Sequence, residues 1–504
     1  MFESRKKEKI KEIDIIKSFY TNILKEKDDM DDITWDDLNM DEVFTHIDDT
    51  RTTSGQHMLY KILRSPQYNN EVLDKRDESI TTIQENDSLS NSLKNIFNTY
   101  RKSMCNMEYI FLNHGEVNQL HRYKCIGAIL LSIVALILVI AFNSSATVVL
   151  FVVAIVINTN IYEGLNFKYS YDKTEGAKYL GKMLVMADKL SKIKCKPLEK
   201  ELNRLKEVSD KCSDVRKKSA LALKLDNLDL IGLMIDYITL IKFFNLFSMI
   251  KCMNKYRDEL LEIYKIIGEI DAFVSVATYR DELEYWCKPK FHSENRIIDI
   301  KELYHPLIEN PISNSLNVQS SGIIITGSNM SGKSTFLRTV GINTILSQTI
   351  FTSLSKSYTA SFYYVVSSIS LKDDIEGGKS YYLCEAEAIK RMIDSSQGNV
   401  RCLALIDEIF KGTNPVERIN AAAEIMEYLS KHGAMTLVAT HDIALTKMVE
   451  RYDNYYFRED VVGNQFKFDY LIKKGVSPTR NAVKILEFLG YPKELIDNIN
   501  LRIK

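Results

Sequence analysis

A loop bounded by two glycines is the part of this sequence whose residue types and spacing most clearly permit chemistry. It lies within G-I-I-I-T-G-S-N-M-S-G-K-S-T, residues 322–335, between an apolar run typical of a buried strand and the start of a helix. Such a loop turns backbone N–H groups toward an anion, and the helix N-terminus adds partial positive charge. Lys333 could reach the β- and γ-phosphates of a nucleotide, and the Ser334 hydroxyl could bind Mg²⁺. The plain alternative is a glycine-rich turn with an incidental lysine.

The predicted nucleotide contacts in this loop are Gly327, Ser328, Asn329, Met330, Ser331, Gly332, Lys333, Ser334 and Thr335. Two adjacent carboxylates end a second apolar strand, in R-C-L-A-L-I-D-E-I-F-K-G-T, residues 401–413. Asp407 could hold Mg²⁺, directly or through water, and Glu408 could polarise the water that attacks a γ-phosphate. By itself such a strand end is usually only a solvated pair. The phosphate loop upstream makes the metal and water roles the preferred interpretation.

A histidine follows a third apolar run, T-L-V-A-T-H-D, residues 436–442. A lone histidine is more often structural than catalytic, but ligands of open α/β sheets bind at the carboxyl edge of the strands. His441 is therefore predicted to sense the γ-phosphate by hydrogen bonding rather than to act as the base.

Short β-rich runs alternate with helices from Ile297 onward, which predicts a parallel sheet with crossover helices. The expected strands after the phosphate loop are residues 362–369, 402–406, 436–439, 455–457 and 466–471, the last two at the edge. This sheet would bring the three candidate stretches to one edge.

The remainder of the chain has helical periodicity, with a helix expected over residues 54–63 and a packed helix over residues 263–277. We expect four segments: helical residues 1–123, an apolar hairpin over 124–165, helical residues 166–295, and the α/β domain over 296–504.

The apolar hairpin consists of two nearly unbroken runs of Ile, Leu, Val and Ala, residues 125–142 and 146–157, joined by Asn-Ser-Ser. Its length and lack of a polar face predict two transmembrane helices. Arg122, Lys124, Lys168 and Lys173 flank the pair, which predicts a multi-pass cell-membrane protein with both termini cytoplasmic. The alternative is a buried hairpin of a large soluble core. Residues 228–250 are also apolar, but their internal charges favour a buried or partner-facing helix.

Composition sets broad limits. At 504 residues with 45% apolar and 26% charged content, the chain is neither disordered nor of low complexity. The net charge of −1 neither supports nor opposes DNA binding. Its eight cysteines are scattered without a C-x-x-C pair, as expected for reduced thiols, and the N-terminus lacks the apolar region of a signal peptide.

The stretches G-S-N-M-S-G-K-S-T, L-I-D-E-I-F-K-G-T and A-T-H-D resemble the ATPase domain of the MutS family, within the ABC-type ATPases. The resemblance covers residues 297–504 well, and residues 38–66 and 263–286 more weakly as the two halves of a core and lever domain. It implies ATP and Mg²⁺ as cofactors and a homodimer of ATPase heads. It also implies that Ser380, in G-G-K-S-Y-Y-L-C-E, contacts the γ-phosphate in trans, and that Ile312 or a neighbour and Tyr470 hold the adenine.

The departures from this family are also informative. Phe2-Glu3-Ser4 does not match the Phe-x-Glu motif of mismatch readers, and the apolar hairpin stands where a DNA-gripping clamp would be. The fold expected is an α/β ABC-type P-loop ATPase domain at the C-terminus, after an all-α lever and core domain interrupted by a transmembrane hairpin. The function expected is a membrane-anchored ATPase whose dimeric heads drive helical levers. Two alternatives remain open, an ATPase that tethers mismatched or branched DNA to the membrane and an ABC-like transporter component.

Overall fold

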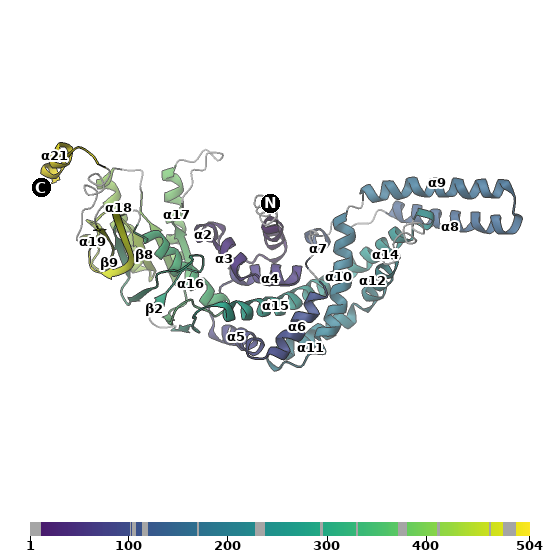
Figure 1. Cartoon of the computed structure of the whole chain (residues 1–504), viewed down its shortest axis with the longest axis horizontal. Coiled ribbons are helices and arrows are strands. Elements are labelled where there is room, and N and C mark those ends of the chain that lie inside the picture. The colour runs from purple at the N-terminus through teal and green to yellow at the C-terminus, as the bar shows by residue number, and fades with distance from the viewer. Residues whose placement is uncertain are drawn as a thin grey trace. The chain divides into compact units, whose positions relative to one another are not determined.

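The computed structural model describes residues 12–100, 102, 107–112, 119–168, 171–226, 237–292, 296–328, 331–370, 381–410, 414–462, 465–476 and 490–503. The chain divides into two compact units (Figure 1). The first contains residues 1–27, 48–61 and 78–279, and the second contains residues 28–47, 62–77 and 280–504. The expected all-helical N-terminal part and mixed α/β C-terminal part are confirmed.

The described part of the first unit is helical. Three helices, α4 (Thr53–Arg64), α5 (Asn70–Glu85) and α15 (Arg257–Glu282), have residues in both units. The others in this unit are η1 (Tyr20–Leu24), α6 (Asp87–Asn98), α7 (Glu108–Phe111), α8 (Gln119–Phe142), α9 (Ser145–Lys168), α10 (Tyr171–Leu190), η2 (Lys196–Leu198), α11 (Glu199–Lys211), α12 (Ser213–Asp226) and α14 (Ile241–Lys255).

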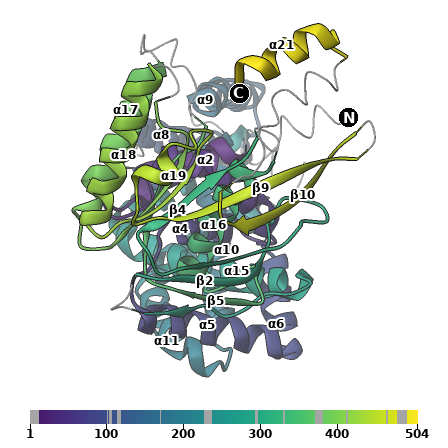
Figure 2. The ribbon, with the colours of Figure 1, turned by 90° about the vertical axis from the view of Figure 1, so that its left-hand side faces the viewer.

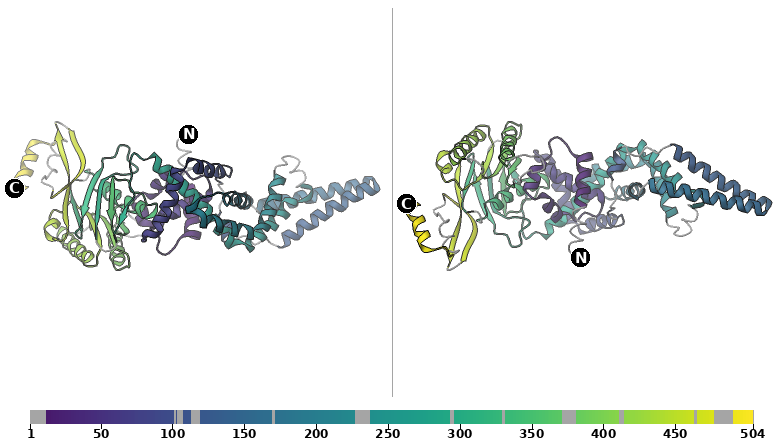
Figure 3. Two further views of the ribbon diagram at one scale, coloured as in Figure 1. Left: turned by 90° about the horizontal axis from the view of Figure 1, so that it is seen from below. Right: turned by 90° about the horizontal axis from the view of Figure 1, so that it is seen from above.

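The hairpin of α8 and α9 is the most apolar element of the first unit. The two helices run side by side and are joined at Asn143, which has a φ of +43° (Figures 1 and 3). Most of their large apolar side chains are exposed, Ile140 at 75% and Val149 at 61% among them. Both helices are long and apolar enough to cross a membrane, and only 22% and 17% of their apolar windows are buried. This low burial is unlike that of a core hairpin.

A buried carboxylate holds the start of α4 within the first unit. Asp271 of α15 accepts hydrogen bonds from the backbone N–H of Arg51 and from both the N–H and the hydroxyl of Thr52. A Cβ at Gly55 would come within 2.1 Å of the Asp271 carboxylate, so only glycine lets the two helices approach this closely. The helix start that the sequence predicts near residue 54 is thus capped by Asp271, which belongs to a helix far away in the sequence.

The second unit combines helices with two sheets. Its helices are α2 (Asp32–Asp37), α3 (Met40–Ile47), α16 (Lys333–Thr349), α17 (Tyr381–Ser396), α18 (Pro415–Lys431), α19 (Leu445–Met448) and α21 (Lys493–Ile503). One sheet has the order β1 (Lys290–Phe291), β5 (Ser357–Ala360), β2 (Ile298–Leu303), β3 (Asn314–Val318). The other has the order β10 (Gln465–Lys474), β9 (Asp453–Val462), β4 (Gly322–Thr326), β8 (Met435–Ala439), β7 (Cys402–Asp407), β6 (Tyr364–Ser368).

Helices cover the six-stranded sheet on both faces (Figure 2). Ala404 and Ile406 of β7 pack in a core with Met392 of α17 and Met426 of α18. On the opposite face α16 packs so closely that a Cβ at Gly341 would lie 2.6 Å from the side chain of Leu405. The faces of the sheet are therefore buried, so a site can form only at the ends of its strands.

Two features differ from the sequence prediction. The six-stranded sheet is mixed rather than parallel, because β10 pairs antiparallel with β9, and the four-stranded sheet was not predicted at all. In addition, residues 28–47 belong to the second unit, although they lie within the segment expected to form the first helical part. Of the apolar stretch 228–250, the structure describes residues 237–250, and α14 begins only at Ile241.

Candidate active site

Three neighbouring parallel strands bring the predicted site residues to one edge of the sheet. β4 pairs with β8 so that Ile325 lies opposite Ala439, and β8 pairs with β7 so that Asp407 also lies opposite Ala439. The loop after β4, the residues after β7 and the residues after β8 therefore begin at the same level. This is the carboxyl edge, where open α/β sheets bind their ligands.

The loop after β4 turns through glycines that other residues could not replace. Gly327 has a φ of +144°, and a Cβ there would lie 2.9 Å from the Phe457 carbonyl. Gly332 has a φ of +103° and directly precedes α16. Lys333, buried in the first turn of that helix, donates hydrogen bonds to the carbonyls of Gly327 (2.8 Å) and Ser328 (2.7 Å). The ammonium group thus lies within the curve of the loop.

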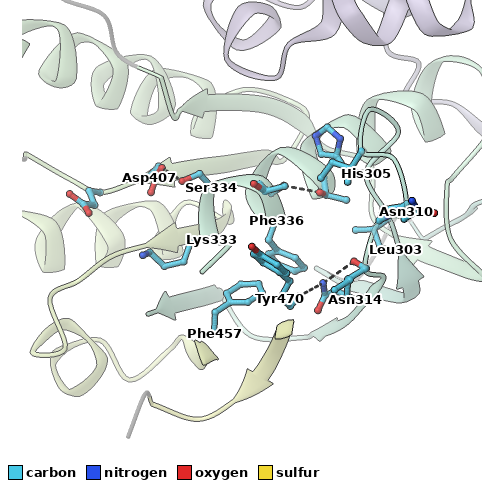
Figure 4. Close-up of a pocket in the computed structure, with 17 residues that line it drawn as sticks. Leu303, His305, Asn310, Asn314, Lys333, Ser334, Phe336, Asp407, Phe457 and Tyr470 are labelled. Atoms are coloured by element: carbon cyan, nitrogen blue, oxygen red, sulfur yellow. Dashed lines mark hydrogen bonds between the residues drawn. The ribbon is translucent and has the colours of Figure 1, made fainter. Parts of the chain in front are cut away.

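A hydroxyl and a carboxylate meet beside this loop. Ser334 donates a hydrogen bond through its Oγ to Oδ2 of Asp407, at the end of β7 (Figure 4). Both atoms are oxygen ligands of the kind that Mg²⁺ prefers, and Mg²⁺ usually takes few ligands from protein and the rest from water and phosphates. The pair therefore fits Mg²⁺. Among the described residues no group of three His, Cys, Asp or Glu side chains could hold a metal by itself.

Glu408 and His441 contact each other between the ends of β7 and β8. Nε2 of His441 lies 3.0 Å from Oε1 of Glu408. Glu408 has a φ of +66°, a conformation that costs an L-residue about 1 kcal/mol and that clusters at functional sites. Arg418 of α18 donates two hydrogen bonds of 2.9 Å to Asp442, the residue after His441. Sequence reasoning missed this bidentate pair, which fixes the strand end that carries the histidine.

A cavity of about 570 Å³ opens next to these groups (Figure 4). The predicted residues Gly332, Lys333, Ser334, Thr335, Asp407 and Glu408 line it together with Ile312 and Tyr470. The other lining residues are Leu303, His305, Ile308, Asn310, Pro311, Asn314, Phe336, Thr339 and Phe457. The cavity is thus charged at the strand ends and apolar and aromatic on its other side, as a nucleotide requires.

Tyr470 reaches the loop because β10 is irregular there. The register of β10 against β9 shifts between Phe468 and Ile472, and Tyr470 has a φ of +51°. Asn314 of β3 holds this bulge from both sides, since it donates to the Tyr470 carbonyl (3.0 Å) and accepts from the Ile472 N–H (2.8 Å). A Cβ at Gly332 would lie 3.3 Å from the Tyr470 ring, so the ring is adjacent to the phosphate loop.

His305 is a further cavity residue that sequence reasoning did not single out. Burial, with a smaller contribution from Arg338, lowers the pKa of His305 to about 4. Its imidazole is therefore neutral at neutral pH. Its Nδ1 accepts the Leu307 N–H at 3.2 Å, which leaves the proton on Nε2. Only its position in the fold, and no local sequence signal, identifies it.

Three predicted contacts, Asn329, Met330 and Ser380, lie outside the described residues. Ser331 and Ser328 are described, and the Ser331 hydroxyl donates to the Ser328 carbonyl (2.8 Å), closing the loop on itself.

Comparisons with known proteins found a family model and several relatives, and the family model covers the region of this site. The family model described as MutS domain V matches residues 323–503. The chain is 28% identical over 251 residues to the DNA mismatch repair protein MutS of Natronomonas pharaonis, which covers 48% of this chain and 29% of that protein. Identity to the proteins of the same description from Thermotoga maritima and Geobacillus thermodenitrificans is 29% over 260 residues and 30% over 258 residues, covering 50% and 49% of this chain. These matches span 32% and 28% of the two relatives, so the chain spans less than a third of each of the three.

Proposed function

Since the chain belongs to the MutS family through residues 323–503, we propose that it is an ATPase, converting ATP and water to ADP and phosphate. The observation that carries this proposal is the convergence of Lys333, Ser334, Asp407 and Glu408 on one cavity. The strand ends supply the charges that phosphoryl transfer requires, and the remaining wall accommodates a base and ribose.

Each group has a distinct part in this reaction. The N–H groups of the loop and the ammonium of Lys333 bind the β- and γ-phosphates, so Lys333 exchanges its carbonyl partners for phosphate oxygens. Ser334 and Asp407 would hold Mg²⁺, which would neutralise charge that develops on the phosphates. Glu408 orients and polarises the attacking water, and His441, 3.0 Å from it, senses the γ-phosphate by hydrogen bonding.

The base is proposed to lie between Ile312 and Tyr470. Both side chains are about half exposed on the cavity wall, where a planar ligand would cover them. The hydrogen bond from Asn314 to the Tyr470 carbonyl supports this assignment. It holds the β10 bulge in place, and the Tyr470 ring lies next to Gly332.

The second proposed feature is a homodimer of ATPase heads in which Ser380 contacts the partner's γ-phosphate. Family resemblance alone supports this role. Mixing chains that carry Ser380→Arg with chains that carry Lys333→Ala tests it, because a heterodimer would contain one intact composite site. Mixed samples no more active than either parent, with heterodimers demonstrated, would exclude contact in trans.

The third proposed feature is membrane insertion of α8 and α9, with the heads on the cytoplasmic side. The exposed apolar surface of the hairpin supports insertion, because water would otherwise face Ile140, Val149 and their neighbours. The cations that flank the hairpin support the orientation. In a cysteine-free background, Ser144→Cys should react with an impermeant maleimide outside intact cells and Ser170→Cys should not. Labelling of both or neither would contradict this topology.

The experiment that tests the proposed function is ATP hydrolysis by the detergent-solubilised protein, with and without duplex, branched and mismatched DNA over a salt series. We expect Mg²⁺-dependent hydrolysis without DNA. Absence of hydrolysis under all these conditions would contradict the proposal.

DNA binding is the competing candidate, because the relatives named above are described as DNA mismatch repair proteins. An ATPase that tethers DNA to the membrane would be stimulated by DNA, and the stimulation would weaken steeply as salt rises. A rate independent of DNA at low salt would favour action of the helical levers on another target.

A further inference from the structure

A break in helical structure lies directly against the α8–α9 hairpin. Residues 237–239 form a short helical turn, Leu240 follows with a φ of +51°, and α14 then begins at Ile241. The Ile238 carbonyl at this break accepts hydrogen bonds from two hairpin side chains, the Ser132 hydroxyl (2.6 Å) and the Asn158 amide. The Asn158 amide also donates to the Ser132 oxygen at 2.6 Å.

Two polar side chains of the hairpin thus donate hydrogen bonds to this carbonyl. Asn158 is fully buried and Ser132 is 3% exposed, whereas the apolar neighbours of both point outward. A backbone group that leaves a helix must find another partner, and the cost of leaving it without one is several kcal/mol in hydrocarbon. The arrangement is therefore the one that an irregular backbone needs at membrane depth.

The position of the polar cluster along the hairpin gives its depth. At ~1.5 Å per residue, Ser132 lies roughly 15 Å from the end of α8 at Phe142, and Asn158 roughly 20 Å from the start of α9. Arg122 and Glu163 lie roughly 27–30 Å from the same ends. The hydrocarbon core is about 30 Å thick, so a spanning hairpin would place the cluster near the midplane and these charges near the headgroups.

The described residues at the start of α14 are apolar for the most part and are buried or half-buried. Phe243 packs edge-on to Tyr162 of α9, with ring centroids 5.3 Å apart, and Phe244 beside it is only half-buried. The far end carries the exposed residues Lys251 and Asn254.

We propose that residues 237–250 form a third membrane element, which enters the bilayer partway beside the hairpin and breaks at Leu240, where Asn158 and Ser132 bind the Ile238 carbonyl. The lipid acyl chain is the partner of the half-buried side of its first turns, which includes Ile241 and Phe244. This inference rests on the proposed insertion of α8 and α9, and it differs from the buried or partner-facing helix that the sequence favoured for this stretch.

Quenching by lipid-attached nitroxides tests the proposal. All eight native cysteines are replaced, and Ile140→Cys, Phe244→Cys and Asn254→Cys are introduced singly, labelled with bimane and reconstituted into phosphatidylcholine vesicles containing acyl-chain nitroxides. We expect strong quenching at positions 140 and 244 and little at 254. Quenching at 140 without quenching at 244 would overturn the third element but leave the hairpin inserted. No quenching at 140 would overturn the proposed insertion itself.

The role of Asn158 is tested in the same assay by a matched pair of variants. Asn158→Leu removes the donor to Ile238, whereas Asn160→Leu removes an exposed amide that bonds only within its own helix, to the Val156 carbonyl (3.1 Å). We expect quenching at position 244 to fall at least twofold with Asn158→Leu and to stay unchanged with Asn160→Leu. An unchanged signal in both variants would remove Asn158 from the account.

Discussion

In the proposed reaction, Lys333 and Glu408 act through different physical effects. Lys333 lies buried within the loop, where its charge would bind phosphate before and during the reaction, while Glu408 would act only on the attacking water. Substitutions at the two positions should therefore separate binding from chemistry.

The first prediction follows from this division. Lys333→Ala should weaken ATP binding at least tenfold, because a desolvated charge contact is lost, whereas Glu408→Gln should bind ATP normally and lower the hydrolysis rate at least a hundredfold. Titration with a fluorescent ATP analogue measures the first effect and phosphate release the second. Hydrolysis at the wild-type rate by Glu408→Gln would refute its assignment.

The second prediction concerns Asn314, which holds the Tyr470 bulge without facing the phosphates. Asn314→Ala removes both hydrogen bonds to β10, and we expect ATP affinity to fall about three- to tenfold, up to about 1.4 kcal/mol, with little change in kcat. Asn317→Ala, an exposed asparagine on the same strand, is the control. Equal affinities for both variants in the same titration would show that Asn314 does not position the tyrosine.

Among the contacts between elements, hydrogen bonds to the carboxylate of Asp37 join α2 to the end of β6. It accepts hydrogen bonds from the Ser367 hydroxyl (2.7 Å) and from the N–H groups of Ile369 and Ser370 (2.9 Å each). Arg338, one turn into α16, donates to the Asp37 carbonyl and to the Ser370 hydroxyl. The phosphate-loop helix and the sheet edge are therefore fixed to the same short helix.

The third prediction is that Asp37→Ala lowers the free energy of unfolding of the second unit by about 3 kcal/mol, because it leaves three donors without their acceptor. Both tryptophans of the chain, Trp35 and Trp286, lie in this unit, so their fluorescence during urea denaturation reports on it. Asp36→Ala, at an exposed position of the same helix, should shift the midpoint little. Equal midpoints for the two variants would contradict the anchoring role.

The fourth prediction is a pH dependence in the first unit. His57 is stacked on Phe19, its Nδ1 bonds to the Tyr264 hydroxyl (2.8 Å), and burial lowers its pKa to about 3. Because its pKa in the unfolded chain is near 6.5, His57 contributes stability above that pH, which is lost as pH falls toward 3. His57→Gln should flatten this part of the unfolding curve.

The measurement is the thermal midpoint of wild type and His57→Gln in detergent between pH 4 and 8. Asp271 contributes an opposite slope, since burial raises its pKa to about 7, but it does so in both proteins. The difference between them therefore isolates His57. A difference that does not vary with pH would mean that His57 is protonated when folded.

Sequence reasoning placed residues correctly where their position follows from a local pattern. Asp407 and Glu408 end an apolar run, and the parallel register of β7 and β8 then brings them to the edge that also holds His441. It failed for the features that depend on pairing between residues far apart in the sequence. The four-stranded sheet joins β1 to β5 and β2 to both β3 and β5, and β3 and β5 are short and largely polar. The position of Tyr470 depends on a bulge and on Asn314 across the unit, which no local signal reveals.

The whole molecule combines, in one chain, a region that matches MutS domain V and the apolar hairpin of α8 and α9. The proposed insertion of α8 and α9 would gain tenths of a kcal/mol for each Leu, Ile, Val or Phe, which would outweigh transfer of the Asn143-Ser144-Ser145 turn. The helical elements would then connect nucleotide turnover to the bilayer.

The fifth prediction tests this central claim directly, through ATP hydrolysis by membranes washed with alkaline carbonate. We predict that the washed membranes retain the chain and its Mg²⁺-dependent activity, and that membranes with the same amount of Glu408→Gln protein have none. Recovery of the activity in the carbonate supernatant would contradict insertion, and equal activity of the Glu408→Gln membranes would contradict the proposed site.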